Sequence, residues 1–469
     1  MRLKFLPVIA VTAAPLFAQT APPSPDRPWS YSAAPRPHAG HATISSRPVL
    51  DPTVTYSLPD LIDIAERNNP ETRAYWERAR EAADALGVSR AALFPALAAV
   101  ASSSMNQYSL FNGTFHHENT TLFPTLLTLS WTVLDFGTRG AAIDVARANL
   151  LAADFTFNDT HRKLIFQVAQ AYYKLLDALS RQETAQAAFA DARVLRDAIE
   201  AKLANGLATL PDALEARSAA AQAQYDLASI QGATQGAQGD LATLLGVSPV
   251  GSIHVRDASS LPSAEDFDTP VETIISRALA QRPDFLAQMA RVNAADSSVR
   301  QARSQFDPVL SFSGNWGHSD AIGQQRGSPE VRSAIYPWQA QFSLVWTIFD
   351  GGARRNQLER ARAGAQEARA EVAVARDRIE DEIWGAYVQL KTSREQQRAA
   401  DALVQAAEQS WSASLEAFQA GVRTFIDVSS AQKNLARARS ARVEARIKLL
   451  SSIANLSFRT GDSIPGTKH

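Results

Sequence analysis

Apolar and polar positions repeat with two different periods along this chain. In two stretches apolar residues recur at 4-3-4 spacing, which is the seam of a coiled-coil helix. These residues are Leu164, Val168, Ala171 and Leu175, and then Ile379, Ile383, Ala386 and Leu390. In two other stretches apolar and polar residues alternate, which is typical of a strand with one apolar and one polar face. The pattern therefore predicts long helices interrupted by strands.

The alternating stretches each place four large apolar residues on one face. They are Leu127, Leu129, Trp131 and Val133, and then Phe342, Leu344, Trp346 and Ile348. The intervening positions hold mostly Thr, Ser and Gln, with Val345 as an exception. Alternating runs near ten residues suit strands that cross a membrane. We therefore expect these eight apolar side chains to face lipid.

Four kinds of segment follow one another twice. Helical segments are expected at 58–91 and 271–305, and β regions at 94–134 and 307–349. Very long helices are expected at 138–205 and 353–420, and shorter helices at 210–245 and 425–458. A helix of about 68 residues spans on the order of 100 Å, at 1.5 Å per residue. Helices of that length favour a tubular or coiled-coil assembly over a compact globule.

An internal repeat with a spacing of 213 to 215 residues underlies this order. Matching pairs include Pro95 and Pro308, Trp131 and Trp346, Asp135 and Asp350, Gly206 and Gly421, and Asp212 and Asp427. We therefore divide the chain into a signal peptide (1–21), a Pro-rich extended segment (22–55), a first repeat (56–248), a linker (249–269), a second repeat (270–461) and a tail (462–469). Chance similarity between Ala-rich segments would not keep most pairs at the same spacing of 215 residues over more than a hundred residues.

The first residues carry the marks of an export signal. Arg2 and Lys4 precede an apolar run from Phe5 to Phe17, and small residues follow it. This run is too short to span a bilayer, because a membrane helix needs about 20 residues. No other stretch approaches that length of apolar sequence, so any membrane insertion would use strands.

Strand counting then requires several copies of the chain. Two hairpins supply only four strands, which cannot close a barrel, and open strand edges are not tolerated in lipid. A membrane role therefore demands oligomerisation. The count by itself allows two, three or more chains.

Composition excludes several classes of function. There are 47 basic and 48 acidic residues, giving a net charge of −1 and no basic block for nucleic acid. With no cysteine, the chain has no disulfide, no thiolate metal site and no Cys nucleophile. The eight histidines are scattered, and no HExxH, GxSxG, GxGxxG or phosphate-binding lysine loop occurs. We expect no catalysis, no cofactor and no resident metal.

Each β region turns into a long helix at an Asp and a nearby Gly. Asp135 and Asp350 can accept hydrogen bonds from backbone N–H groups at the positive end of the helix. Gly137 and Gly352 permit the sharp change of direction. We interpret these four residues as the strand–helix junction.

Together these features resemble the TolC-like outer-membrane efflux protein family, over about residues 56–461. The segments that carry the resemblance are LSWTVLDFGTRG and LVWTIFDGGARRN at the junctions, and LANGLATLPDALEAR and FQAGVRTFIDVSSAQ at the helical turns. The resemblance implies a homotrimer with four strands per chain in a 12-stranded barrel, mainly helical otherwise. The helices would continue the barrel as an α-barrel across the periplasm, and the protein would lie in the cell outer membrane.

The resemblance also implies roles for the helical tips. Gly206, Leu207, Gly421 and Val422 would contact a periplasmic adaptor protein. Arg423, Asp212 and Asp427 would form a charge network that narrows the inner end of the tunnel. Ser430 and Phe418 depart from the pattern of some members, which have Asp and Tyr there. The other expected partners are outer-membrane lipid and an inner-membrane transporter of the RND or ABC type.

Two functional hypotheses remain open from the sequence. The first is a passive conduit for efflux or secretion, powered by inner-membrane partners. The alternative is a periplasmic coiled-coil structural or adaptor protein without a pore. Hairpins that interrupt the helices twice, at repeat positions, favour the conduit. The sequence does not identify the cargo or the type of pump.

Overall fold

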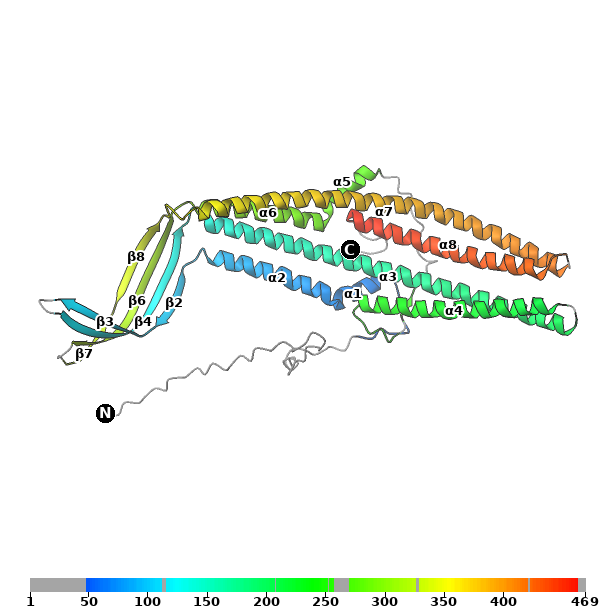
Figure 1. The fold of residues 1–469 in the computed structure, drawn as a ribbon, viewed down its shortest axis with the longest axis horizontal. Helices are drawn as coiled ribbons and strands as arrows, with labels where there is room; N and C mark the ends of the chain where they lie inside the picture. The colour runs from blue at the N-terminus through cyan, green and yellow to red at the C-terminus, as the bar shows by residue number, and fades with distance from the viewer. Residues whose placement is uncertain are drawn as a thin grey trace, which may run out of the picture. The chain divides into compact units, whose positions relative to one another are not determined.

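The computed structural model describes residues 48–111, 115–206, 208–251, 253–256, 270–325, 329–420 and 422–462. The expected signal peptide, most of the Pro-rich segment and of the linker, and the tip residues Leu207 and Gly421 lie outside these ranges. Figure 1 shows the long helices and the separate sheet that the two repeats build.

Both repeats contain four helices in the same order. In the first repeat they are α1 (Leu58–Asn68), α2 (Pro70–Ala91), α3 (Thr138–Ala204) and α4 (Leu210–Leu244). In the second they are α5 (Val271–Gln281), α6 (Pro283–Ser304), α7 (Ala353–Gln419) and α8 (Phe425–Thr460). The two 67-residue helices, α3 and α7, confirm the predicted rods.

The first helical segment of each repeat is broken once, which the sequence analysis did not separate. The breaks fall at Asn69 and Arg282, each followed by a proline that disfavours helical geometry at the residue before it. At the same position relative to the repeat, Asn69 Nδ2 donates to Leu244 O (3.2 Å) and Arg282 Nη1 donates to Arg459 O (3.3 Å). The two repeats therefore fix the break with equivalent hydrogen bonds from different side chains.

The sheet consists of antiparallel strands. They are β2 (Ala96–Ala101), β3 (Ser104–Phe111), β4 (Phe115–Leu134), β6 (Val309–Gln325), β7 (Val331–Ile335) and β8 (Trp338–Val345). β4 and β6 pair at the centre; β2 and β3 both pair with β4, and β7 and β8 both pair with β6. β2 and β3 follow one another along the same edge of β4, and β7 and β8 do so along β6. We call each such pair one interrupted strand path. The sheet then has four strand paths, in agreement with two hairpins per chain. The predicted strand through Ile348 ends earlier, at Val345.

The helices lie side by side in a fixed order. Next to the sheet, α2 packs on α3, α3 on α6, and α6 on α7. Farther along the rods, α3 packs on both α4 and α8, and α8 packs on α7. The largest apolar core lies where α1, α3, α4 and α8 meet, around Val168, Tyr172 and Leu241. A short parallel pair, β1 (Thr55–Tyr56) and β5 (His254–Val255), lies beside this core. Within the described ranges, no helix combines the length and the hydropathy needed to cross a bilayer.

Candidate functional site: the sheet, its junctions and the helical tips

One face of the sheet is apolar and exposed. Residues that are directly opposite in an antiparallel ladder lie on the same face. Leu127 is paired with Trp316, and Trp131 with Phe312, whose other neighbour is Phe342. Phe342 and Leu344 are 69% and 66% exposed, and no helix makes extensive contact with the sheet among the described residues. Large apolar side chains therefore cover a surface that the protomer leaves open.

The ladders place five of the eight predicted residues on this face and leave three outside the regular pairing. Leu127, Leu129, Trp131, Phe342 and Leu344 lie on it. The ladder between β4 and β6 shifts register between Thr132 and Leu134, so Leu134, not Val133, is paired opposite Leu310. Trp346 and Ile348 follow β8 and are exposed, outside the regular ladder.

The opposite face is lined with polar side chains that contact one another. Asn315 Nδ2 donates to Gln339 Oε1 at 3.2 Å, and Gln339 Nε2 donates to Gln341 Oε1 at 3.2 Å. Ser313 and Ser130 are paired on the same face. The sheet is therefore apolar on one side and hydrogen-bonding on the other, as a wall between lipid and water requires.

The apolar band has a defined height. Trp316 and Trp338 are paired with each other at one end of β8, and both are largely exposed. The eight residues of β8 span roughly 26 Å at about 3.3 Å per residue. Because outer-membrane strands are tilted by about 35–45°, this length rises about 20 Å, most of the apolar band of about 25 Å that such strands present to lipid between aromatic side chains.

The strand–helix junctions are built twice from the same parts. Asp135 Oδ2 accepts from the Arg139 backbone N (2.8 Å) and Nε (2.9 Å), and Asp350 Oδ2 accepts from the Arg354 backbone N (3.0 Å) and Nε (2.7 Å). The other carboxylate oxygens accept from the backbone N of Gly137 and Gly352. Both glycines have positive φ, 105° and 89°, a conformation that costs a residue with a Cβ. In both junctions the glycine lies at the N-cap position, and the Asp two residues earlier accepts hydrogen bonds from backbone N–H groups at the helix start.

The junction also ties each strand to the helix before it. Trp131 Nε1 donates to Leu93 O (3.0 Å), and Trp346 Nε1 donates to Phe306 O (3.1 Å). Arg139 Nη1 donates to Ala92 O at 3.1 Å, as Arg354 Nη1 does to Gln305 O at 3.5 Å. The sequence analysis missed both arginines, although they lie at the repeat spacing and four residues after each Asp.

The junction carboxylates stay ionised to low pH. Burial by itself would raise the pKa of Asp135, but the hydrogen bonds and charge of Arg139 outweigh it and lower that pKa. The pKa of Asp350 is lowered by hydrogen bonds from the Arg354 side chain and backbone. Each carboxylate is therefore held in its charged form at the start of a long helix.

At the tips, the predicted charge network is not assembled within one protomer. Asp212 Oδ2 accepts from Thr209 Oγ1 (2.6 Å), and Asp427 Oδ2 accepts from Thr424 Oγ1 (2.8 Å), so each Asp completes a capping box. Arg423 Nη1 instead donates to Ser414 Oγ at 3.1 Å. The pKa of Asp427 is lowered, mainly by the Thr424 hydrogen bonds and less by the Arg423 charge. Gly206 reverses the chain with φ 71°, and Val422 beside the other turn is 80% exposed.

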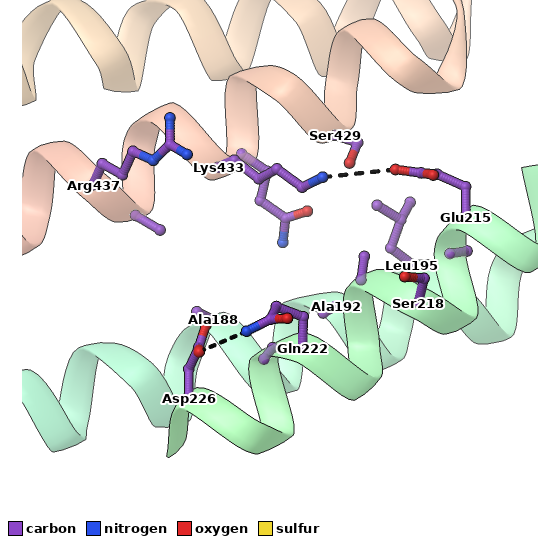
Figure 2. Close-up of a pocket in the computed structure, with 15 residues that line it drawn as sticks. Ala188, Ala192, Leu195, Glu215, Ser218, Gln222, Asp226, Ser429, Lys433 and Arg437 are labelled. Atoms are coloured by element: carbon purple, nitrogen blue, oxygen red, sulfur yellow. Dashed lines mark hydrogen bonds and ion pairs between the residues drawn. The ribbon is translucent and has the colours of Figure 1, made fainter. Parts of the chain in front are cut away.

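A groove of about 480 Å³ runs beside the first tip, between α3, α4 and α8. Small residues of α3, including Ala188 and Ala192, line it together with polar residues of α4 and α8. Figure 2 shows Glu215 of α4 and Lys433 of α8 reaching toward one another across it, with Oε1 and Nζ 3.7 Å apart. The groove is thus lined by alanines of α3 and bordered by acidic and basic side chains of α4 and α8.

The comparisons with known proteins agree with this geometry. The family model described as "Outer membrane efflux protein" matches residues 61–247 and 274–462, one match for each repeat. The chain is 28% identical to CyaE of Bordetella pertussis over 354 residues, covering 74% of this chain and 72% of that protein. It is 26% identical to the pyoverdine export outer membrane protein OpmQ of Pseudomonas aeruginosa, covering 95% of this chain and 92% of that protein.

A solved structure of the outer-membrane channel OprN has the same fold. It superimposes with a TM-score of 0.76 at 22% identity, covering 89% of this chain and 95% of the other. The fold, the duplicated unit and the family match agree with one another and set aside the alternative of a coiled-coil protein without a pore. The chain belongs to the outer membrane efflux protein family, whose trimeric channels, not enzymes, serve tripartite efflux and secretion systems, and it is an outer-membrane channel subunit that extends into the periplasm.

Proposed function

We propose that three copies of this chain join their sheets into one 12-stranded barrel, through which cargo leaves passively. The observation that carries the proposal is the sheet itself. It has an exposed apolar face, a polar face, and outer strand paths (β2/β3 and β7/β8) that each pair on one side only among the described residues. An edge of this kind in lipid requires a partner strand. A second copy of the chain offers one at each edge.

The partners on the periplasmic side are part of the same proposal. The tips at Gly206, Leu207, Gly421 and Val422 contact a periplasmic adaptor, and the groove between α3, α4 and α8 accepts one of its helices. An inner-membrane transporter of the RND or ABC type supplies the energy, since the sequence of this chain has no phosphate-binding lysine loop. The exposed Val422 and the alanine-lined groove support a helical partner.

The shared barrel is tested with engineered cysteines, since the natural chain has none and gives no background. One cysteine is placed on β2, for example Ala98→Cys, and one is moved along β8 from Gln339 to Ser343. Residues directly opposite on neighbouring strands have Cβ atoms about 4.5–5.5 Å apart, and a small shift brings them to the about 3.5–4.5 Å of a disulfide. We expect at least one register to give covalent trimers on denaturing gels after oxidation.

The single-cysteine variants are the matched controls and should remain below trimer size. If all registers give only monomers, or a covalent ladder beyond three copies, the proposed trimeric barrel is wrong. The adaptor contact has its own readout, co-purification of an adaptor with the wild type and not with a Val422→Asp variant. The two parts of the proposal can therefore fail separately.

A further inference from the structure

A second groove lies between α6 and α7, next to the strand–helix junction at Asp350 and Gly352. It has a volume of about 300 Å³. Its polar lining comes from Ser298 and Gln301 of α6, from Gln305 just after α6, and from Gln357 and Arg360 of α7. Gln305 also places its carbonyl oxygen next to Arg354, so the groove begins where the sheet joins the helices.

The first repeat provides an internal control for this groove. At the repeat-equivalent positions it has Ala85, Val88, Ala92, Ala142 and Val145. Each polar side chain of the second repeat is therefore matched by an alanine or a valine in the first. In the first repeat α2 and α3 pack together without polar residues at these positions. The packing of α6 on α7 therefore does not explain why the second repeat has five polar residues there.

The charge of the groove also sets it apart. The lining contains the Arg360 guanidinium and no carboxylate. Three other grooves among the described residues each contain acidic and basic side chains together. Neighbouring arginines on α7 are neutralised, Arg362 by Glu359 (2.8 Å) and Arg369 by Asp296 (2.9 Å). Among the described residues, Arg360 and the side chains of Gln301, Gln305 and Gln357 have no such partner.

We propose that this groove binds a phosphate group. A guanidinium offers paired N–H donors that match two oxygens of such a group, and the glutamine amides add N–H donors around it. Ser298 Oγ already donates to Ala294 O, which leaves its lone pairs as acceptors for a neighbouring hydroxyl. The chemistry fits either the phosphate of a phospholipid head group at the junction or the phosphate of a solute.

Two probes distinguish these sources. Phosphatidylglycerol is added to the purified full-length protein in detergent and its retention is followed by native mass spectrometry, with diacylglycerol as the lipid that lacks phosphate. Glycerol 3-phosphate is titrated against the same protein by ligand-observed NMR, with glycerol as its uncharged match. We expect retention or binding of at least one phosphate probe and of neither uncharged one.

Variants of the groove decide whether that binding is local. Arg360→Gln removes the charge from an exposed helical position and should weaken binding about tenfold, the change for one charge-assisted hydrogen bond. The set Gln301→Val, Gln305→Ala, Gln357→Ala and Arg360→Val copies the first repeat and should abolish binding. Arg362→Gln, which removes a guanidinium already paired with Glu359, is the control and should bind as the wild type does.

The outcomes are distinct. Phosphatidylglycerol alone identifies a lipid site, and glycerol 3-phosphate alone identifies a solute site. Failure of both phosphate probes with the wild type overturns the proposal. So does binding that survives in the four-residue variant, or a loss as large with Arg362→Gln as with Arg360→Gln. Because the assay needs no conductance, its result is independent of the trimeric barrel.

Discussion

Gly317 lies on β6 between the part that pairs with β8, which reaches Trp316, and the part that pairs with β7, which begins at Ser319. Its backbone N donates to Pro337 O between β7 and β8, and nearby Ser102 N donates to Pro124 O between β2 and β3. A Cβ at Gly317 would lie 2.1 Å from Thr125 O and 2.8 Å from the Leu126 Cα. Only a residue without a side chain fits so close to a neighbouring backbone.

We expect Gly317→Ala to lower the yield of folded, heat-resistant oligomer strongly, because two strands must separate to admit the methyl group. Gly314→Ala is the control on the same strand. Its Cβ would meet Gln339 O at 3.5 Å, an ordinary contact. Semi-native gels of membrane extracts measure both. Equal yields for the two variants would show that the sheet tolerates a side chain at Gly317.

Prediction from sequence worked at this scale wherever one residue and its near neighbours decide the outcome. The hydrogen bonds of Asp135 and the positive φ of Gly137 follow from local capping and backbone geometry. The register shift beside Val133 depends on the partner strand, which alternation along one strand does not reveal. The bonds from Trp131 and Trp346 to carbonyls about 40 residues away were invisible for the same reason.

At the scale of elements, each junction joins a strand to a long helix, and a charged Asp carboxylate accepts hydrogen bonds at the start of that helix. The pKa of both Asp135 and Asp350 is lowered in the folded protein. The unfolded chain, with carboxyl pKa values near about 3.9, therefore binds more protons in acid than the folded one. The stabilisation is complete above that value and is lost as the pH falls through the lowered pKa.

We therefore expect the midpoint of thermal unfolding to fall as the pH drops below about 4, and to fall less in an Asp135→Asn, Asp350→Asn double variant. Circular dichroism of the helices between pH 2 and pH 7 measures this. Asp381→Asn, on an exposed face of α7, is the control for the substitution itself. An acid dependence as steep in the double variant as in the wild type would remove the junction from the explanation.

The long helices were predicted within one or two residues because their seams, caps and prolines are local signals. The breaks at Asn69 and Arg282 were less visible. Arg282 is held by Asp284 at 2.7 Å, but also by Glu382 at 3.0 Å and the carbonyl of Arg459, which are far away in sequence. Side-chain partners at that separation are set by packing, and a single sequence does not record them.

At the scale of the whole molecule, no ion pair joins the tip charges within the described residues of one protomer. Within one protomer Asp212 and Asp427 cap helices and Arg423 bonds to Ser414. The positive charge of Arg423 contributes, after the Thr424 hydrogen bonds, to the lowered pKa of Asp427. We propose that neighbouring protomers complete the network and thereby narrow the inner end of the tunnel.

Arg423→Ala combined with Asp212→Ala should then raise the single-channel conductance in planar bilayers, because opposite charges no longer hold adjacent tips together. Thr209→Ala removes the helix cap and keeps the charge of Asp212, so it separates loss of the cap from loss of the network. Unchanged conductance in the double variant, or an equal rise with Thr209→Ala, would remove these charges from control of the aperture.

The two spacings of the internal repeat have one more consequence. The offset is 213 residues before the hairpins, at Pro95 and Pro308, and 215 after them, at Trp131 and Trp346. The difference of two residues therefore lies within the hairpins, while donors at the later offset still reach acceptors at the earlier one. Because the base keeps the same bonds in both repeats, the difference in length is taken up toward the far end of the hairpin. Changes in length, whether natural or made for labelling, belong at that far end.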